Sequence, residues 1–379
     1  MKLPRLAISS ALLSLAAAVF LFPNCTAQDS SGNQSWSATS QQGSPDGAVN
    51  PTRTSQTHTE ADGRVVDKTA VQTLGPDGRY IPYSDTEKES RRINDTTVQT
   101  IERTFGTDPD GHRTLIQERQ EESRSLPGGE QKVSRTVSNP DANGALQVVQ
   151  REQEDSKQIS PAVRVTNTTV LTPDGNGGFS PAVQTEQRET KNSDGTIALK
   201  KSTQLSDGTG GWKLSEVREG KSKQENGQVV SKEERILRPD SNGNLAVVER
   251  TVSKGNQAAA GDKRETTETY STNVPGVAGD DSLQLVQRQT TVQRTTSAGV
   301  LSTVRQTEQP SPGDVNNSFQ VTEEAIDIVR PGSGKTADET HMILTPSSDG
   351  GLGQVWVDTG RSDNPAAIKV DTTPSSKPK

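Results

Sequence analysis

Turn-forming dipeptides recur along this chain at a nearly constant spacing. Ten of them, six being Pro-Asp, begin at positions 45, 76, 109, 140, 173, 206, 239, 275, 312 and 346, at intervals of 31 to 37 residues. Proline presets φ for a turn, and the Asp side chain can cap the turn. Such a period, near 33 residues, indicates tandem repeats, and repeats build extended surfaces more often than catalytic pockets.

Each repeat is predicted to be a β-hairpin. Looser breakers, among them Asp62-Gly63 and Asp194-Gly195, lie halfway between the major turns, and such pairs supply the positive φ angles of tight hairpin turns. Thr and Val are frequent in the intervening segments and favour strands over helices. Each unit therefore contains two strands of about a dozen residues, joined by one wide and one tight turn.

Large apolar residues recur at two fixed positions relative to the major turns, and we call these positions the two apolar columns. One lies six residues after the turn and contains Leu115, Leu146, Phe179, Trp212, Leu245 and Leu352. The other lies just before it and contains Leu74, Val137, Val170, Ile236 and Ile343. A disordered chain has no reason to hold such columns in phase. Partial disorder stays the alternative, because only 27% of residues are hydrophobic and 3% are aromatic.

The predicted fold class is all-β: tandem hairpin repeats forming an elongated, twisted antiparallel meander. About eighteen strands spaced by ~4.8 Å would extend on the order of 85 Å. A closed barrel and a two-sheet sandwich are the alternatives, and the sequence does not decide between them. Side-chain alternation is clean around residues 197–205, but doublets at Val148-Val149 and Val247-Val248 blur it.

The two ends of the chain are predicted to lie outside the repeats. Residues 1–27 have a positive start, an apolar core and small residues before Gln28, as in a secretory signal peptide. Lipid attachment at Cys25 is the weaker hypothesis, because Phe22-Pro23-Asn24 is a poor lipoprotein site. Residues 28–44 are a predicted flexible leader, 45–361 the β-hairpin repeat domain, and 362–379 a disordered tail.

Charge excludes some partners. Removing Lys2 and Arg5 from a formal net charge of −7 leaves −9, which disfavours nucleic acid and anionic membranes. Acids and bases alternate, as in residues 118–124, so the charges are predicted to form solvated faces. Cys25 is the only cysteine, so cleavage after residue 27 leaves no disulfide or cysteine-ligated metal.

No cofactor or metal site is predicted. The turns at 140–144, 173–177 and 239–243 resemble the Asp-x-Asn-Gly half of a calcium loop, but no acid follows at a constant offset. The turn interpretation is favoured, and weak calcium binding stays open. Residues 332–336 resemble the end of a phosphate-binding loop. However, Val329 stands where that loop needs glycine, and Gly332 falls at a minor turn.

No catalytic residue is predicted, and the chain is expected not to be an enzyme. His58, His112 and His341 lie in separate repeats without ligand spacing and are expected at the surface. The acid pairs Glu121-Glu122 and Glu233-Glu234 sit in mixed-charge runs without an aromatic-lined cleft. Trp212 belongs to the apolar column and is expected to pack rather than to bind sugar.

These observations predict an exported, non-enzymatic structural or adhesive β-repeat protein of the bacterial cell exterior. The alternative is a polysaccharide- or protein-binding module that uses a repeated sheet face or an open edge. The partner would be extracellular (matrix, glycan or protein), with no nucleic acid and no transmembrane segment after signal cleavage. The predicted location is secreted or at the cell surface, or else periplasmic, and the oligomeric state stays open.

Overall fold

The computed structural model describes most of the chain between residues 34 and 362. The described residues are 34–43, 52–75, 77–108, 110–225, 228–257, 262–272, 282–311, 318–332, 336–347 and 351–362. The predicted signal peptide and residues 363–379 of the predicted tail lie outside them, so both assignments stay predictions. Among the described residues, no helix has the length and apolarity that crossing a membrane requires.

The described residues form one sheet of twenty antiparallel strands. They are β1 (Gln34–Gly43), β2 (Thr52–Ala61), β3 (Arg64–Leu74), β4 (Tyr80–Asn94), β5 (Thr97–Thr107), β6 (Arg113–Leu126), β7 (Glu130–Pro140), β8 (Leu146–Ser160), β9 (Val163–Pro173), β10 (Phe179–Lys191), β11 (Thr196–Ser206), β12 (Trp212–Glu225), β13 (Gln228–Pro239), β14 (Leu245–Gln257), β15 (Lys263–Ser271), β16 (Gln284–Thr295), β17 (Leu301–Pro310), β18 (Phe319–Pro331), β19 (Ala337–Pro346) and β20 (Leu352–Ser362). A single 3₁₀ turn, η1 (Pro127–Gly129), joins β6 to β7. The predicted all-β antiparallel meander is confirmed.

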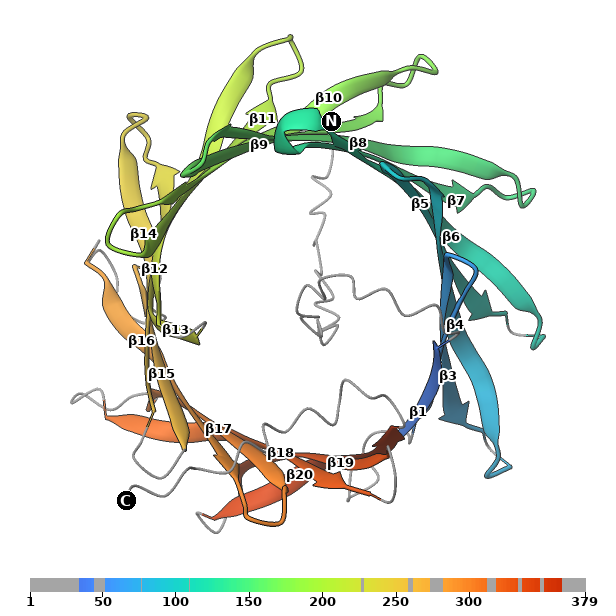
Figure 1. Ribbon diagram of the computed structural model, residues 1–379, viewed down its shortest axis with the longest axis vertical. Helices are drawn as coiled ribbons and strands as arrows, with labels where there is room; N and C mark the ends of the chain where they lie inside the picture. The colour runs from blue at the N-terminus through green and yellow to red at the C-terminus, as the bar shows by residue number, and fades with distance from the viewer. Residues whose placement is uncertain are drawn as a thin grey trace, which may run out of the picture.

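The two ends of the meander meet. β1 pairs antiparallel with β2 and also with β20, and Figure 1 shows the strands arranged in order around a ring. The elongated open form is therefore wrong, and the pairing corresponds to the closed-barrel alternative. The assignment of residues 28–44 to a flexible leader is also wrong in part, since residues 34–43 form β1. The backbone of β1 pairs with two strands, and one of these pairings is long-range, so the Ser- and Gln-rich sequence of the segment does not predict it.

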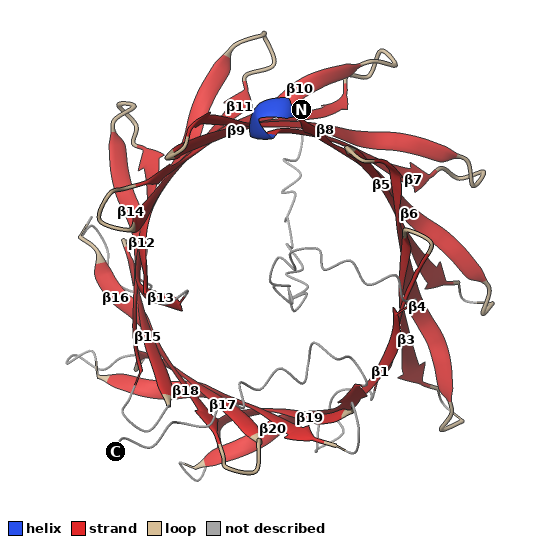
Figure 2. Cartoon of the chain, viewed as in Figure 1, coloured by secondary structure: helices blue, strands red, loops and turns tan. Residues whose placement is uncertain are grey.

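Nine hairpins with wide turns, from β3–β4 to β19–β20, carry a β-bulge at the same place, whereas β1 and β2 pair without a register shift. The register shifts there by one residue, leaving the following residues without a direct partner: Tyr83, Ile116, Val149, Ala182, Ser215, Val248, Val286, Thr322 and Val355. A bulge bends its strand and increases its twist. Beyond the bulges the hairpins accordingly radiate outward from the ring, as Figures 1 and 2 show. We call these outer parts the hairpin arms.

The wide turns follow a stricter period than the Pro-Asp dipeptides do. Six of them begin at residues 75, 108, 141, 174, 207 and 240, each 33 apart, and in each of these six the first residue donates its N–H to the carbonyl four residues on. Pro109 follows the first position, whereas Pro140 precedes it, which produces the uneven 31- and 33-residue intervals. The fourth position is always a glycine with positive φ, for example Gly144 at 81°.

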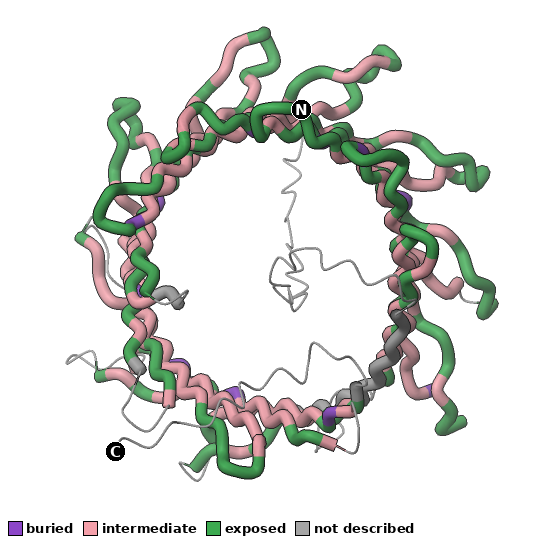
Figure 3. Tube along the Cα trace, viewed as in Figure 1, coloured by how far each residue is buried: buried purple, intermediate pink, exposed green. Residues whose placement is uncertain are grey.

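The barrel wall contains little apolar core. The buried hydrophobic residues among those described are Val133, Val217, Ile236, Ala325 and Ala337, and Figure 3 shows buried positions scattered around the ring. Most of the wall is half-buried. Backbone ladders and cross-strand side-chain pairs must therefore supply much of its stability.

Candidate functional site

The wall has two faces that can be followed by register. Directly opposed residues on antiparallel strands lie on the same face, and successive residues alternate between faces. Arg135 on β7 is opposed to Glu121 on β6 and to Glu152 on β8, and we call their side of the wall the Arg135 face. Arg103 on β5 is opposed to Glu118 on β6, and we call the other side the Glu118 face.

On the Arg135 face, one arginine binds three carboxylates. The Arg135 guanidinium donates to Glu121 at 2.7 Å, to Glu154 at 3.1 Å and also to Glu152. Its side chain is only 19% exposed. Burial lowers the Arg135 pKa, but the hydrogen bonds to Glu121, Glu154 and Glu152 outweigh burial and raise it well above its usual value. This group stays charged and holds three strands together.

The same face carries charges of alternating sign on neighbouring strands. Lys88 on β4 opposes Glu102 on β5, which opposes Arg119 on β6. Together with Thr100 and Glu121 they line a depression of about 160 Å³. Opposite charges directly across a ladder stabilise the sheet and keep the local net charge low.

The Glu118 face is also charged. Arg103 Nε donates to Glu118 at 2.7 Å, Gln120 donates to the same carboxylate at 2.8 Å, and Glu118 is only 6% exposed. A buried carboxylate is tolerated when it is paired and hydrogen-bonded, as this one is. Both faces of the wall therefore present ion pairs.

Arg113 fastens a hairpin arm to the wall. Its guanidinium donates to Asp85 and Glu87 on β4, and its central carbon lies 3.3 Å from the centre of the Phe105 ring. Arg113 lies at the start of β6, so this contact reaches across β5. Hydrogen bonding to Asp85, the largest cause, raises the Arg113 pKa.

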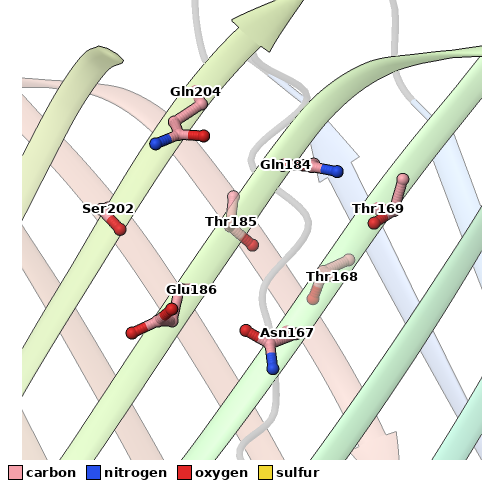
Figure 4. Close-up of a pocket in the computed structure, with 8 residues that line it drawn as sticks. All are labelled: Asn167, Thr168, Thr169, Gln184, Thr185, Glu186, Ser202 and Gln204. Carbon is pink, nitrogen blue, oxygen red and sulfur yellow. The ribbon is translucent and has the colours of Figure 1, made fainter. Parts of the chain in front are cut away.

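A region of β9, β10 and β11 contains a depression with a largely uncharged lining. It has a volume of about 250 Å³ and is lined by Asn167, Thr168, Thr169, Gln184, Thr185, Glu186, Ser202 and Gln204 (Figure 4). Glu186 supplies the only charge in this lining. Hydroxyl and amide groups can donate and accept hydrogen bonds, so the region suits water and small hydrated solutes rather than one charged ligand.

The three histidines lie on separate hairpins, as expected from the sequence. Two of them, which were expected simply at the surface, each contact an aspartate on the facing strand. His58 Nδ1 lies 2.6 Å from Asp67 Oδ1, and His341 Nδ1 lies 2.5 Å from Asp327 Oδ1. The two-residue turn Asp62-Gly63 fixes the β2–β3 register and sets His58 opposite Asp67. The Asp62-Gly63 turn is visible in the sequence, and the register that it fixes could have predicted this pair.

The sequence-adjacent acids do not form carboxylate pairs. Glu121 and Glu122 alternate faces, with Glu121 bound to Arg135 and Glu122 bound to Arg124. Glu233 likewise binds Arg235, while its neighbour faces the other side. Hydrogen bonding to Arg235, the largest cause, lowers the Glu233 pKa, so this group holds an ion pair rather than a transferable proton.

In the Asp-rich turns, the Asp carboxylates accept hydrogen bonds from backbone N–H groups of the same turn. Asp141 Oδ1 accepts the N–H groups of Asn143 at 2.8 Å and Ala145 at 2.9 Å, and these bonds, led by Ala145, lower the Asp141 pKa. The same two bonds recur at Asp108, Asp174, Asp207 and Asp240. Among the described residues, Asp108, Asp110 and His112 are the group close enough to share a cation, within 4.8 Å.

The two other motifs from the sequence are Trp212 and the loop-like segment at 332–336, and their described residues take part in strand and turn structure. Trp212 is half-buried at the start of β12, directly opposite Ser206, while the side chains of Trp36 and Trp356 lie outside the described part. Gly332 donates its N–H to the Thr336 carbonyl, which closes a hairpin turn, and residues 333–335 lie outside the described residues.

Comparisons with known proteins concern the fold. No known family and no curated protein matches the sequence. The ferric enterobactin receptor PfeA in complex with BCV-L6 is similar at a TM-score of 0.50 and 8% identity, over 89% of this chain and 82% of that one. The siderophore receptor PirA from Pseudomonas aeruginosa gives 0.45 at 10% identity, over 89% and 81%. OpdO from the same organism gives 0.38 at 8% identity, over 87% and 95%.

The predicted role as a secreted structural or adhesive repeat protein is wrong. It required an extended rod, whereas β1 and β20 pair and close the strands into a ring, and the similar fold is that of the ferric enterobactin receptor PfeA. The open-edge form of the binding-module alternative is wrong as well, because β1 and β20 pair instead of leaving open terminal edges. This likeness concerns the fold, so the predicted location stays a prediction.

Proposed function

We propose that this chain is a water-filled conduit of the cell envelope, through which small hydrophilic solutes pass. The observation that carries the proposal is a closed ring of twenty strands whose two wall faces are both polar. In barrels of this strand number the interior exceeds what side chains can fill. The barrel likeness to a receptor for ferric enterobactin supports passage or capture of an extracellular small molecule.

The distribution of charge over the two faces of the wall indicates whether the wall lies in lipid or in water. Arg103 and Glu118 lie on one face, and Arg135 lies on the other, each in the middle of its strand. An arginine or lysine on the lipid-facing side of a barrel costs about 2–4 kcal/mol at the bilayer midplane. Charges on both faces, repeated on strand after strand, therefore favour a wall that stands in water.

The lining on β9, β10 and β11 favours hydrated solutes, because Asn167, Thr169 and Gln184 share one face and offer hydrogen bonds. Thr168 and Thr185 share the other face and offer hydrogen bonds as well. The net charge of −9 that remains without residues 1–27 disfavours anions. The proposal gives the chain no catalytic role.

Size-graded labelling tests for the hollow ring. Thr185 and Gln184 are adjacent on β10 and face opposite sides of the wall, so one of them lines the interior. In a Cys25→Ser background, Thr185→Cys and Gln184→Cys would each be treated with a small maleimide and with one carried on a long polyethylene glycol. We expect both positions to accept the small reagent and only one to accept the large reagent. Equal labelling of both positions by both reagents would contradict the hollow ring.

A blocking experiment tests passage. Cells that export each cysteine variant would be measured for uptake of a small hydrophilic sugar, before and after a bulky maleimide is attached. Uptake should fall when the adduct is on the interior position, and the adduct on the other face is the matched control. Uptake that is independent of the chain, or unaffected by the interior adduct, would overturn the proposed function.

A further inference from the structure

The β5–β6 arm folds back over the wall. Its Arg113 guanidinium donates to Asp85 and Glu87 on β4, two strands away. Gly111, at the tip of this arm, and Lys68 on β3 line one cleft of about 390 Å³. An arm tip can meet wall residues of β3 only if the arm bends toward the face on which their side chains lie.

The wall residues that this arm meets belong to the Glu118 face. Lys68 opposes Glu87, and Glu87 opposes Arg103. Arg103 in turn opposes Glu118. Asp85 lies two residues before Glu87 on the same strand, so its side chain points to the same side. The β5–β6 arm therefore bends toward the Glu118 face.

Other arms bend in the same direction. The Phe179 ring of the β9–β10 arm lies 4.3 Å from the guanidinium carbon of Arg151 on β8, two strands away. The Phe319 ring of the β17–β18 arm lies 5.3 Å from that of Arg288 on β16. Followed strand by strand through the register, both arginines lie on the Glu118 face.

The direction of the arms distinguishes the two faces of the ring. The arms radiate away from the ring, as Figure 1 shows, and they cover the face toward which they bend. The Glu118 face is therefore the outer surface, and the opposite side of every wall strand is turned toward the centre of the ring.

We propose that the Arg135 face is the inner surface of the ring and that its charged groups select the solutes that pass. This inference rests on the proposed conduit and adds which side chains a solute meets. Arg135 binds Glu121, Glu152 and Glu154, so one positive and three negative charges, a net charge of 1 − 3 = −2, face the interior at neutral pH. Such a cluster attracts small cations and repels anions.

Elsewhere the inner surface carries an uncharged ladder. Ser253 on β14 opposes Thr267 on β15, and their hydroxyl oxygens lie 2.8 Å apart. Gln289 on β16 opposes Thr307 on β17 and donates to its hydroxyl at 3.4 Å. These groups offer hydrogen bonds without charge. The solutes that fit both parts of the inner surface are small hydrated cations and uncharged polar molecules.

Two pairs of adjacent threonines test the assignment of the faces. Thr168 and Thr169 are neighbours on β9, Thr290 and Thr291 are neighbours on β16, and each pair has one member on each face. In a Cys25→Ser background, each threonine would be changed to Cys and tagged with a short biotin maleimide, and mass spectrometry would confirm equal tagging. Streptavidin is too bulky to enter a lumen on the order of 40 Å in diameter. We expect it to bind the tags at 169 and 290 and not those at 168 and 291.

The other outcomes separate this inference from the proposed function. Binding at 168 and 291 alone would reverse the faces and overturn the inference, while the hollow ring would stand. Binding at all four positions would overturn both. Failure to bind at 169 and 290 would also overturn the assignment of the outer face.

Charged thiol reagents test the selection. Thr168 directly opposes Glu154, whereas Thr169 opposes Gln153. Cationic and anionic methanethiosulfonates of similar size would be timed on Thr168→Cys and Thr169→Cys. We expect the ratio of cationic to anionic rates to be at least about threefold higher at Thr168→Cys. Glu154→Gln should lower that ratio toward the value at Thr169→Cys.

Salt provides the second measurement on the unaltered cluster. At 1 M salt the Debye length is about 3 Å, so the difference between the two positions should disappear. Equal ratios at low salt, or a difference that 1 M salt leaves unchanged, would overturn selection by the Arg135 face.

Discussion

The barrel wall and the hairpin arms come from the same repeat but differ in what holds them. A wall strand has ladder partners on both sides and places charged pairs on both faces, as Arg135 and Glu118 show. An arm pairs only within its own hairpin, as where the β4–β5 ladder ends at Ser84 while β4 continues to Tyr80. The bulge between them lets one sequence unit build a curved wall and an outward arm.

Aromatic residues mark this division. Five of them lie beside an arginine, with guanidinium-to-ring distances of 3.3 to 5.9 Å: Tyr80 with Arg53, Phe105 with Arg113, Phe179 with Arg151, Tyr270 with Arg250 and Phe319 with Arg288. Such contacts contribute about 0.5–1 kcal/mol each at exposed sites. Phe105 and Arg113 lie within one arm, whereas the other four contacts join an arm residue to a neighbouring strand. All five are weaker than the continuous ladders that hold the wall.

Truncating a buried wall residue should give the largest effect. Ile236 is 9% exposed in the wall, and Ile236→Ala should lower the free energy of unfolding by about 2–4 kcal/mol. Ile116, the bulge residue of an arm, is 50% exposed, and Ile116→Ala should change it by less than about 1 kcal/mol. Denaturant unfolding of both variants measures the difference. Equal losses would erase the distinction between wall and arm.

Removing Arg135, which binds three carboxylates in the wall, should give the second-largest loss in the free energy of unfolding. Arg135→Leu leaves Glu121, Glu152 and Glu154 close together without their cation and should cost about 2–3 kcal/mol at neutral pH. Salt screens the repulsion among these carboxylates, so the deficit should shrink as ionic strength rises. Arg124→Leu, at a side chain 60% exposed, should cost less than about 0.5 kcal/mol. A deficit independent of ionic strength would show that packing, not charge, is lost.

Loosening one arm should have a smaller and local effect. Arg151→Gln removes the cation 4.3 Å from the Phe179 ring and should cost about 0.5–1 kcal/mol. Hydrogen exchange should quicken in the arm around Phe179 and stay unchanged in the wall part of β10. Faster exchange throughout β10 would mean that arm and wall unfold as one unit.

Acid titration of the arm turns should give the smallest effect. Backbone N–H bonds, led by that of Asn244, lower the Asp240 pKa. A carboxyl whose folded pKa is depressed stabilises the fold above its unfolded pKa, and this support is lost as pH falls through the folded value. The Asn244 amide shift in an NMR titration should therefore change at a pH below the usual Asp value. A midpoint at the usual value would contradict the capping role.

The sequence predicted the local parts of this fold and missed the long-range ones. The wide turns follow from local chemistry: Asp141 caps and Gly144 supplies positive φ, and both were visible in the Pro-Asp spacing. The bulges were visible but misjudged. The doublets that blurred alternation contain the bulge residues Val149 and Val248, so the apparent noise was the repeated structural feature.

Closure could not be predicted, because it depends on two segments more than 300 residues apart. The strand at 34–43 is rich in Ser and Gln and lacks the apolar alternation that marks a half-buried strand. Cross-wall contacts were missed for the same reason. The 33-residue period of the turns aligns Arg113, and not Leu115, with Leu146 and Phe179. Only the bulge and the β4–β5–β6 register bring Arg113 to Asp85.

Small-angle X-ray scattering of residues 28–379 tests the closed ring most directly. Twenty strands spaced by ~4.8 Å and tilted by about 40° form a hollow barrel on the order of 40 Å in diameter. The scattering should show the secondary minima of a hollow cylinder and a pair-distance distribution without a long tail. The profile of a solid rod, with a cross-section of one sheet and a tail reaching about 95 Å, would contradict closure of the ring.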